Sequence, residues 1–366
     1  MSIRIGIVGA GLWTERAHLP AFTHLPGVTV SGIADPDVER ARTLAARFGV
    51  ARAVGDHRAL LDLGLDALSI VAPDDVHHAV AAAALDAGLP VLCEKPLART
   101  VPEAADLVAR AAATGVATKL GFVFRYSPAL RQLRALVRDG YVGRVHSLTV
   151  YSQNPQFMDP AAPFHWKMDG ARTGGGVVVE YGSHSLDLAR WIAGEIEEVC
   201  ANARTVVPDR PDPLRGGRRR VEVDDVCSWL GTQEGGVESM FHSSWASIGQ
   251  PWGDLAVFGD RGALVWRRRD DAWPFAELLG ATAAAPRLAP LALPGHLTAG
   301  LEWATTWREC FMGNLARAFV AEVGGAPVEG PTFQDGYHAQ LGLAAIATSL
   351  AERRWVAVSP PERPVR

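Results

Sequence analysis

The chain is poor in cysteine, the residue that holds many small folds together. Only four occur among 366 residues, Cys93, Cys200, Cys227 and Cys310, and no two of them form a Cys-x-x-Cys pair. This spacing predicts neither a disulfide framework nor a zinc site, and we expect no bound metal. Scattered cysteines of this kind are typical of a reducing compartment.

The sequence also lacks long apolar runs and an excess of basic charge. No stretch approaches the roughly 20 apolar residues of a membrane helix. The first residues lead directly into a strand pattern, without the basic head and apolar segment of a signal peptide. We therefore expect a cytoplasmic protein with no membrane partner. The formal net charge of -4 gives no electrostatic reason to expect nucleic acid as a partner.

The composition is that of a globular protein, and the length suggests two domains. Hydrophobic residues make up 48% and charged residues 21% of the chain. In residues 1–122 short apolar runs alternate with helical stretches, which predicts a parallel sheet because parallel strands need crossover helices. In residues 123–366 consecutive strand patterns between 196 and 267 indicate an antiparallel sheet. We predict an α/β fold with a doubly wound parallel sheet in the first domain and an α/β second domain.

The remaining segments of the second half carry weaker signals. Residues 280–296, rich in Ala, Pro and Leu, are expected to form an irregular loop. Arginine clusters at 218–220 and 267–269 lie beside acidic residues, and we interpret them as solvated turns at strand edges. Two helices, near 300–324 and 334–353, are expected before a last short strand.

A dinucleotide-binding pattern follows the first strand. Gly9-Ala10-Gly11-Leu12-Trp13 opens a helix; the first glycine permits a tight turn, and the second lets the backbone approach a pyrophosphate at the helix N-terminus. The third position of this fingerprint is usually Gly or Ala. Here it is Thr14, so the contact between helix and strand must accommodate a branched side chain. Strand, glycines and helix together predict dinucleotide binding.

Asp35 ends the second strand, where an acidic residue binds the adenosine ribose hydroxyls of a dinucleotide. Alternatively, or in addition, it caps the helix that starts beyond Pro36. Because a carboxylate repels a 2′-phosphate, we favour NAD over NADP as cofactor. Arg40 and Arg42 lie close by and keep NADP open.

Lys95 stands between an apolar run and a proline, in the stretch Val91-Leu92-Cys93-Glu94-Lys95-Pro96. This arrangement places a cation at a strand-to-loop corner. The corner is either an ordinary surface turn or the point where the cofactor meets a second substrate, and a motif this short does not distinguish the two.

A helix introduced by Gly174-Gly175-Gly176 carries Glu180, His184 and Asp187. The four-residue spacing places Glu180 and His184 on one helix face, where a carboxylate can raise the basicity of the imidazole and fix its tautomer. The histidine then suits general base catalysis. The alternative is a stabilising pair on an exposed helix, although the three glycines favour close approach of a ligand or of another backbone segment.

Together these motifs resemble the glucose–fructose oxidoreductase/inositol dehydrogenase family, Gfo/Idh/MocA, over nearly the whole chain. The specific part is Glu94-Lys95-Pro96 followed by the glycine-led helix with its acid and histidine, in that order. The further matching residues are Gly9, Gly11, Ala72, Pro73, His77, Gly121, Phe122, Arg125, Pro128, Arg354 and Trp355.

The resemblance implies a Rossmann domain followed by an α/β domain with a large, mostly antiparallel open sheet, through which family members often form oligomers. We therefore expect a homodimer or a homotetramer. It also implies NAD(P)-dependent oxidation of a secondary alcohol of a sugar, sugar derivative or cyclitol, or reduction of the matching ketone. Two other functions stay open: NAD-dependent cleavage of a glycoside through transient oxidation of the sugar, and a non-catalytic dinucleotide sensor.

The resemblance also assigns roles to single residues. Lys95 binds the reacting oxygen, and its peptide bond to Pro96 is expected to be cis. His184 exchanges the hydroxyl proton, and Glu180 supports His184. The residues expected to bind the cofactor are Gly9, Ala10, Gly11, Leu12, Trp13, Asp35, Ala72, Pro73, His77, Glu94 and Lys95. Those expected to bind the substrate are Lys95, Arg125, His165, Trp166, Glu180 and His184. Trp166 either stacks on a sugar face or belongs to the core.

The sequence departs from the family pattern at two positions. The family's acid before the histidine is often Asp, and the longer Glu180 reaches either the substrate or only His184. Val123 stands where many relatives carry Asn, which removes one polar contact. These departures favour a substrate other than a plain inositol or glucose.

Overall fold

The computed structural model describes residues 2–249 and 251–359, and the chain divides into two compact units. The first consists of Met1–Pro128, Asp270–Phe275 and Pro294–Tyr337, and the second of Ala129–Arg269, Ala276–Leu293 and His338–Arg366. Each unit therefore gathers segments that are distant in the sequence. The domain boundary predicted after residue 122 stays a prediction, because the two units are defined by packing alone.

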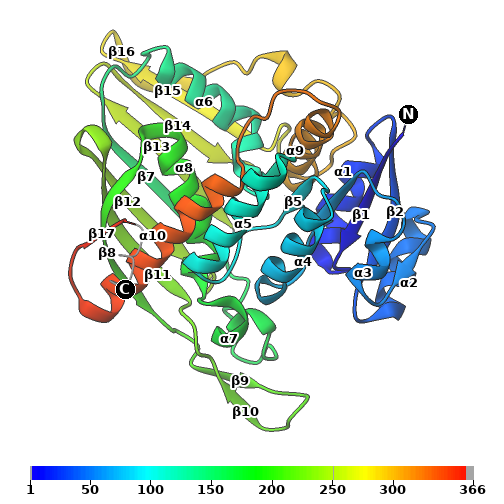
Figure 1. The fold of residues 1–366 in the computed structure, drawn as a ribbon. Coiled ribbons are helices and arrows are strands. Elements are labelled where there is room, and N and C mark those ends of the chain that lie inside the picture. Colours follow the sequence, from blue (N-terminus) through cyan, green and yellow to red (C-terminus); the bar gives the residue numbers. More distant parts are fainter. Residues whose placement is uncertain (1, 250, 360–366) are drawn as a thin grey trace. The chain divides into compact units, whose positions relative to one another are not determined.

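The first unit is built on a parallel six-stranded sheet with the strand order β3-β2-β1-β4-β5-β6 (Figure 1). Every neighbouring pair runs parallel, which confirms the prediction. The chain order reverses between β1 and β4, and at such a point the carboxyl ends of the strands open a crevice for a ligand. The strands are β1 (Ile3–Val8), β2 (Val28–Ala34), β3 (Ala53–Val54), β4 (Ala67–Ile70), β5 (Val91–Cys93) and β6 (Thr118–Leu120).

Helices connect these strands, and their ends carry the expected signals. Asp37 caps α2 (Val38–Phe48), which ends at Gly49 with a φ of 68°, and Thr100 caps α5 (Val101–Thr114). The other connecting helices are η1 (Thr14–His18), α1 (Leu19–Thr23), α3 (His57–Leu61) and α4 (Asp74–Asp86). Sequence analysis does not anticipate β3 and α3, because so few residues give no readable period.

A helix from late in the chain, α9 (Trp307–Val323), belongs to the first unit and packs against η1 and α1. The ring of Trp307 lies 6.0 Å from that of Trp13 and 5.5 Å from that of Phe124, measured between centroids. This aromatic cluster attaches the start of α9 to the helix that follows the glycine loop. All three side chains are partly exposed, so the apolar surface that they do bury, together with the ring contacts, is what contributes to stability.

The other end of α9 is fixed by a buried ion pair. Lys119 Nζ, in β6, lies 2.5 Å from Glu322 Oε1 and also donates to the carbonyl of Glu329. The two charged side chains are 0% and 2% exposed. Loss of either partner leaves an uncompensated buried charge, which is strongly destabilising.

The second unit contains a nine-stranded sheet with the order β16-β15-β14-β13-β7-β12-β11-β8-β17. Neighbours run antiparallel except β7 and β12, which run parallel, so the expectation of a mostly antiparallel sheet is confirmed. The strands are β7 (Val145–Gln153), β8 (Ile196–Arg204), β11 (Val226–Gln233), β12 (Val237–Ser244), β13 (Trp252–Gly259), β14 (Gly262–Arg268), β15 (Ala276–Thr282), β16 (Ala285–Pro290) and β17 (Val356–Ala357).

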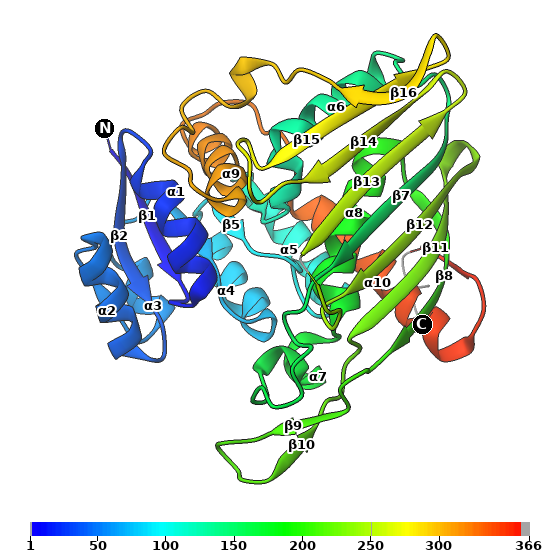
Figure 2. The same cartoon turned by 180° about the vertical axis from the view of Figure 1, so that it is seen from behind.

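One face of this sheet is covered by α6 (Pro128–Arg138), α8 (Ser183–Ala193) and α10 (Phe333–Glu352). Over the other face the described residues place no helix (Figure 2). Side chains alternate accordingly along the central strands. Trp229 and Phe241 are buried and stack with ring centroids 3.5 Å apart, whereas their neighbours Leu230 and Met240 are 47% and 55% exposed.

The prediction of an irregular loop over residues 280–296 is wrong. Strands β15 and β16 occupy much of this segment and pair antiparallel at the edge of the sheet. All residues of β16 are exposed, so the strand has no alternation of buried and polar residues that would mark it in the sequence. Backbone pairing with β15 defines it instead, and an edge strand tolerates its prolines.

A two-stranded hairpin of β9 (Asp209–Pro211) and β10 (Arg218–Arg220) projects from the second unit (Figure 2). Arg218–Arg220 therefore form a short strand and not a turn, but Arg218 and Arg220 are exposed, as the interpretation of a solvated cluster expects. Arg219 Nη2 pairs with Asp169 Oδ2 at 2.9 Å, so its charge is used inside the unit. The second arginine cluster also reaches into a strand, because Arg267 lies in β14.

No helix in the described residues combines the length and the hydropathy needed to cross a membrane. The same residues hold no group of three His, Cys, Asp or Glu side chains able to bind a metal ion. All four cysteines are free thiols.

Candidate functional site

The loop after β1 contains one glycine that the fold requires and one that it does not. Gly9 has a φ of 102°, and a Cβ there would lie 2.3 Å from the backbone oxygen of Val71. A Cβ on Gly11 would meet no atom within 4 Å, and the φ of Gly11 is not left-handed. Gly11 therefore faces open space at a helix N-terminus, which is the geometry that lets a phosphate group approach the backbone.

Asp35, just beyond β2, holds the same loop in place. Its Oδ2 accepts a hydrogen bond from Ala10 N at 2.7 Å. Its Oδ1 accepts from Asp37 N at 2.9 Å and pairs with Arg40 Nη2 at 2.7 Å. The cap of α2 is Asp37, so the alternative interpretation of Asp35 as the helix cap is wrong. The carboxylate stands at the carboxyl end of β2, where ribose hydroxyls bind in Rossmann folds.

Thr14, at the third fingerprint position, is fully buried, and its hydroxyl donates to Gly9 O at 2.7 Å. The helix begins here as the π-helical turn η1, a rare form found often at functional sites. The branched side chain is thus accommodated by a hydrogen bond that stabilises the glycine turn.

Glu94, directly before Lys95, is the centre of a buried hydrogen-bond network. Its Oε1 accepts from Trp13 Nε1 at 2.8 Å and lies 2.9 Å from His18 Nε2, while His18 Nδ1 lies 2.9 Å from Ser69 Oγ. Its Oε2 accepts from Lys95 N at 3.3 Å. Burial opposes ionisation, but the hydrogen bonds and the neighbouring ammonium group outweigh it and hold the pKa of this carboxyl below its usual value. An ionised carboxylate therefore joins the glycine loop to the lysine corner.

His77 connects the loops that follow β4 and β5. Its Nδ1 lies 2.7 Å from Pro96 O, and its Nε2 lies 2.9 Å from Ala72 O. A carbonyl only accepts, so both bonds form only when both ring nitrogens carry a proton. Burial favours the neutral ring, but Cys93, Asp74 and the Pro96 carbonyl outweigh it and raise the pKa of His77 to about 10. Direct contact of this fully buried side chain with the cofactor stays a prediction.

The peptide bond between Lys95 and Pro96 is cis, which confirms that prediction. Lys95 is the second residue after β5 and is partly exposed. Behind it, a Cβ on Gly121 would lie 2.6 Å from Glu94 Oε2. The glycine after β6 therefore makes room for the buried carboxylate beside the lysine.

Arg125 lies in the short helical turn η2 (Val123–Tyr126) and is 7% exposed. Its Nη2 pairs with Asp335 Oδ1 at 2.9 Å. Val123 is 2% exposed, so at this departure from the family pattern the chain has a buried apolar side chain. Substrate contact by Arg125 stays a prediction.

In the second unit, Asp224 contacts the start of the helix that Gly174-Gly175-Gly176 introduces. The two carboxylate oxygens of Asp224 accept from Gly176 N at 3.0 Å and from Val178 N at 2.8 Å. A Cβ on Gly176 would lie 2.0 Å from the backbone oxygen of Asp224. Burial raises the pKa of this carboxyl against the lowering effect of the amide bonds. Close approach of another backbone segment, one of the two options left open by the sequence, thus explains Gly176.

Glu180 lies in the π-helical turn η4 (Val178–Gly182), and His184 lies in the first turn of α8. Glu180 Oε1 pairs with Lys167 Nζ at 2.6 Å, and the two side chains are 24% and 21% exposed. The longer acid thus reaches a cation that sequence reasoning did not assign to it. The prediction of one shared helix face assumes uninterrupted α-helical spacing, and a contact between Glu180 and His184 stays a prediction.

The loop that carries Lys167 also presents His165 and Trp166. His165 Nδ1 accepts from Lys167 N at 3.3 Å, which places the proton of the neutral ring on Nε2. Burial and the charge of Lys167 lower the pKa of His165 to about 4, so the ring is neutral at neutral pH. Trp166 is partly exposed, which excludes its interpretation as a fully buried core residue.

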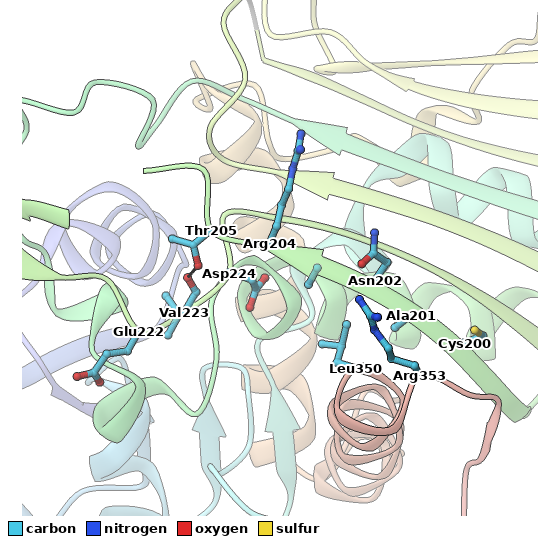
Figure 3. A pocket seen from close by; sticks show the side chains of 11 residues that line it. Cys200, Ala201, Asn202, Arg204, Thr205, Glu222, Val223, Asp224, Leu350 and Arg353 are labelled. Atoms are coloured by element: carbon cyan, nitrogen blue, oxygen red, sulfur yellow. Dashed lines mark hydrogen bonds between the residues drawn. The ribbon is translucent and has the colours of Figure 1, made fainter. Parts of the chain in front are cut away.

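A cavity of about 410 Å³ lies in the second unit between β8, the segment before β11 and the end of α10 (Figure 3). Asn202, Arg204 and Arg353 line it, and none of the predicted site residues does. Its connection to the glycine-led helix is indirect, through Asp224, which forms part of its wall.

The two halves of the chain match two known protein families. Residues 3–122 match an oxidoreductase family with an NAD-binding Rossmann fold, and residues 130–265 match the GFO/IDH/MocA C-terminal domain. The chain belongs to the Gfo/Idh/MocA family of oxidoreductases. The resemblance carried by the sequence motifs is thereby confirmed.

Other family members match along their full length. Levoglucosan dehydrogenase of Pseudarthrobacter phenanthrenivorans is 26% identical over 388 residues, covering 98% of each chain. Inositol 2-dehydrogenase of Acidothermus cellulolyticus is 29% identical over 373 residues, covering 99% of this chain and 97% of the relative. A solved structure of levoglucosan dehydrogenase with NADH and L-sorbose has a TM-score of 0.89 at 26% identity, covering 98% of this chain and 100% of that one. The family is thus one of NAD-dependent dehydrogenases that act on sugar and cyclitol hydroxyls.

Sequence reasoning missed the partners that hold this Gfo/Idh/MocA site together. Lys167 directly follows the predicted substrate residues His165 and Trp166, but a lone loop lysine gives no sign of which acid it meets. Asp224 is equally unmarked, since its role depends on a contact with Gly176, far away in the sequence. The run Gly174-Gly175-Gly176 is the one available signal, because glycine often marks a close backbone approach.

Proposed function

We propose that this protein oxidises a secondary alcohol of a sugar, sugar derivative or cyclitol, or reduces the matching ketone, with NAD as the redox cofactor. The bound cofactor supplies the hydride acceptor. Support comes from the family, from relatives that bind NADH and sugars, and from the presence of Lys95, Glu180 and His184 in this chain.

The single observation that carries the proposal is the cofactor half of the site. Gly11 faces open space at a helix start. The Asp35 carboxylate lies just beyond the end of β2, and Lys95 lies beyond β5 at the same edge of the sheet. These groups fit the pyrophosphate, the ribose and the reacting oxygen respectively. The remaining predicted cofactor residues, Ala10, Leu12, Trp13, Ala72, Pro73, His77 and Glu94, flank them in the sequence or hold them in place.

In the proposed reaction, His184 and Lys95 divide the work. His184 accepts the hydroxyl proton as the carbon loses hydride and the C=O bond forms. Its Nδ1 is buried, so Nε2 is the ring nitrogen proposed to exchange the proton. The ammonium group of Lys95 donates to the same oxygen and stabilises its developing negative charge. Glu180 supplies a carboxylate that stabilises the imidazolium once it forms.

Three further residues are proposed to shape the sugar pocket. The neutral His165 offers its Nε2 proton to a substrate hydroxyl, and Trp166 offers a ring face for stacking. Arg125 is proposed to contact the substrate through its guanidinium, which the ion pair with Asp335 holds in a fixed orientation.

The proposal favours NAD over NADP. The Asp35 carboxylate is 5% exposed, is held by Ala10 N, and repels a second phosphate. Its partner Arg40 partly offsets that charge, which explains why NADP is not excluded.

We also propose that the open face of the nine-stranded sheet joins copies of the chain into a homodimer or homotetramer. Leu230 and Met240, paired across β11 and β12, are 47% and 55% exposed, and Phe258 of β13, beyond β7, is 38% exposed. Light scattering coupled to size exclusion tests this. A wild-type monomer, or an unchanged oligomer in Met240→Asp with Leu230→Asp, contradicts the proposal.

The deciding experiment incubates the purified protein with NAD or NADP and a panel of inositols, hexoses, pentoses and glycosides, and follows reduced nicotinamide by absorbance. Reduction with a narrow set of polyols, lost in Lys95→Ala and His184→Ala, supports the proposal. Release of free sugar from a glycoside with no net reduction indicates the glycoside-cleaving alternative. NAD binding without any turnover points to a sensor.

A further inference from the structure

The function proposed so far gives a role to Glu180 but none to Lys167, which forms an ion pair with it. Its charged atoms lie 2.6 Å apart, and each side chain is about three quarters buried. A pair at this depth is screened less by solvent than a surface pair, so each charge acts more strongly on its neighbours. Glu180 is also the proposed partner of the catalytic histidine.

The loop that delivers Lys167 is fixed on both sides of it. On one side, His165 Nδ1 accepts the backbone N–H of Lys167. On the other, Asp169 caps α7 (Gly170–Thr173) and pairs with Arg219 Nη2 at 2.9 Å. The guanidinium of Arg219 also lies 4.0 Å from the ring centroid of Phe164. These contacts fix the backbone of Lys167, so the flexible side chain of Lys167 carries its ammonium group from an anchored position.

A carboxylate at the depth of Glu180 takes up a proton more readily once its cation is removed. A neutral Glu180 cannot stabilise a histidine that has gained a proton. We propose that Lys167 is a positioning residue of the reaction: its ammonium group keeps the Glu180 carboxylate ionised and directed, so that the carboxylate serves His184 as a charged partner. This inference rests on the proposed dehydrogenase function.

The effect belongs to the chemical step, so it separates kcat from KM. In Lys167→Met, kcat falls by about 10-fold with KM nearly unchanged, and the acid limb of kcat/KM moves up by about one pH unit. Lys167→Arg, which keeps the charge, restores most of the rate. Arg218→Met is the matched control, because Arg218 is an exposed cation of the neighbouring hairpin that pairs with Asp209.

A double-mutant cycle isolates the pair. Glu180→Gln alone lowers kcat, and adding Lys167→Met lowers it little further, because the lysine acts through the carboxylate. Multiplicative losses, or an unshifted pH profile in Lys167→Met, overturn the inference and leave the dehydrogenase function standing. A stable but inactive Lys167→Arg also contradicts it, since a charge at this position is all that the inference requires.

A second readout does not depend on turnover. Removing the charge of Lys167 raises the pKa of His165 from about 4, which NMR titration of its ring protons detects. A raised value supports the described place of the ammonium group, and an unchanged value contradicts it. If the wild type oxidises no polyol while this titration shifts, the proposed function fails and the inferred role in catalysis fails with it, although the ion pair exists.

Discussion

Trp13 Nε1 donates to Glu94 Oε1 at 2.8 Å, which links the glycine loop after β1 to the residue before Lys95. The two ends of this bond belong to the segments expected to hold the cofactor and the reacting oxygen. The indole ring also packs against Trp307 of α9. One side chain therefore connects the fingerprint loop, the lysine corner and a helix from late in the chain.

Replacing Trp13 by Phe keeps the ring and removes the N–H. Because a buried, ionised acceptor loses a donor, we expect the free energy of unfolding to fall by about 1–3 kcal/mol. NADH binding is expected to weaken as the loop loses its link to Glu94. Chemical denaturation and NADH fluorescence titration measure the two effects. Trp355→Phe, at a site 42% exposed, serves as control; equal behaviour of the two variants contradicts the prediction.

The two glycines of the loop are expected to respond differently to alanine. Gly9→Ala forces a φ of 102° on an alanine and a contact of 2.3 Å with a backbone oxygen, so the protein unfolds more easily or does not fold. Gly11→Ala introduces a methyl group into open space, so the melting temperature changes little while NAD binding is lost or much weakened. Calorimetry and NAD titration of both variants test this. Wild-type affinity in Gly11→Ala speaks against a phosphate site there.

Arg40 is expected to tune the choice between NAD and NADP. Its guanidinium lies 2.7 Å from Asp35 Oδ1, and its side chain is 53% exposed. In Arg40→Met the negative charge of Asp35 is no longer offset, so the ratio of NADP to NAD dissociation constants rises by about 10-fold, a difference of about 1.4 kcal/mol. Asp35→Asn shifts the ratio in the opposite direction. Arg42→Met, which removes a cation paired with Glu39 instead, leaves it unchanged; a shift of equal size there rejects the prediction.

His77 is expected to make stability depend on pH above neutrality. Its pKa rises from 6.5 to about 10 in the folded state, so the folded protein holds a proton that the unfolded chain releases. The contribution is fully present below pH 6.5 and is lost as pH rises towards 10. The difference in unfolding free energy between wild type and His77→Gln therefore shrinks across this range. Urea titrations at several pH values measure it, and a difference that stays constant or grows is incompatible with a protonated ring.

Much of the first unit follows from local sequence. Buried runs such as Ile3–Val8, helix stops such as Gly49 and the glycine loop are local signals, because each depends on the backbone preferences of a few residues. The cis bond at Pro96 is predicted instead from the resemblance to the family and not from local backbone preference. Exposed elements give no such signal, so the sequence of the edge strand β16 predicts a loop.

The sequence by itself determined the alternation of strands and helices in the first unit apart from β3 and α3, the family and the residue types available for chemistry, since periodicity and motifs are properties of adjacent residues. Only the tertiary structure decided which side chains meet. The pairing of Glu180 with Lys167, the cap on Gly176 by Asp224 and the pairing of Asp35 with Arg40 all depend on where the backbone returns to itself. Electrostatic and hydrogen-bond energies fall steeply with distance, so the protonation and orientation of the candidate site are set by these contacts and not by spacing along the chain.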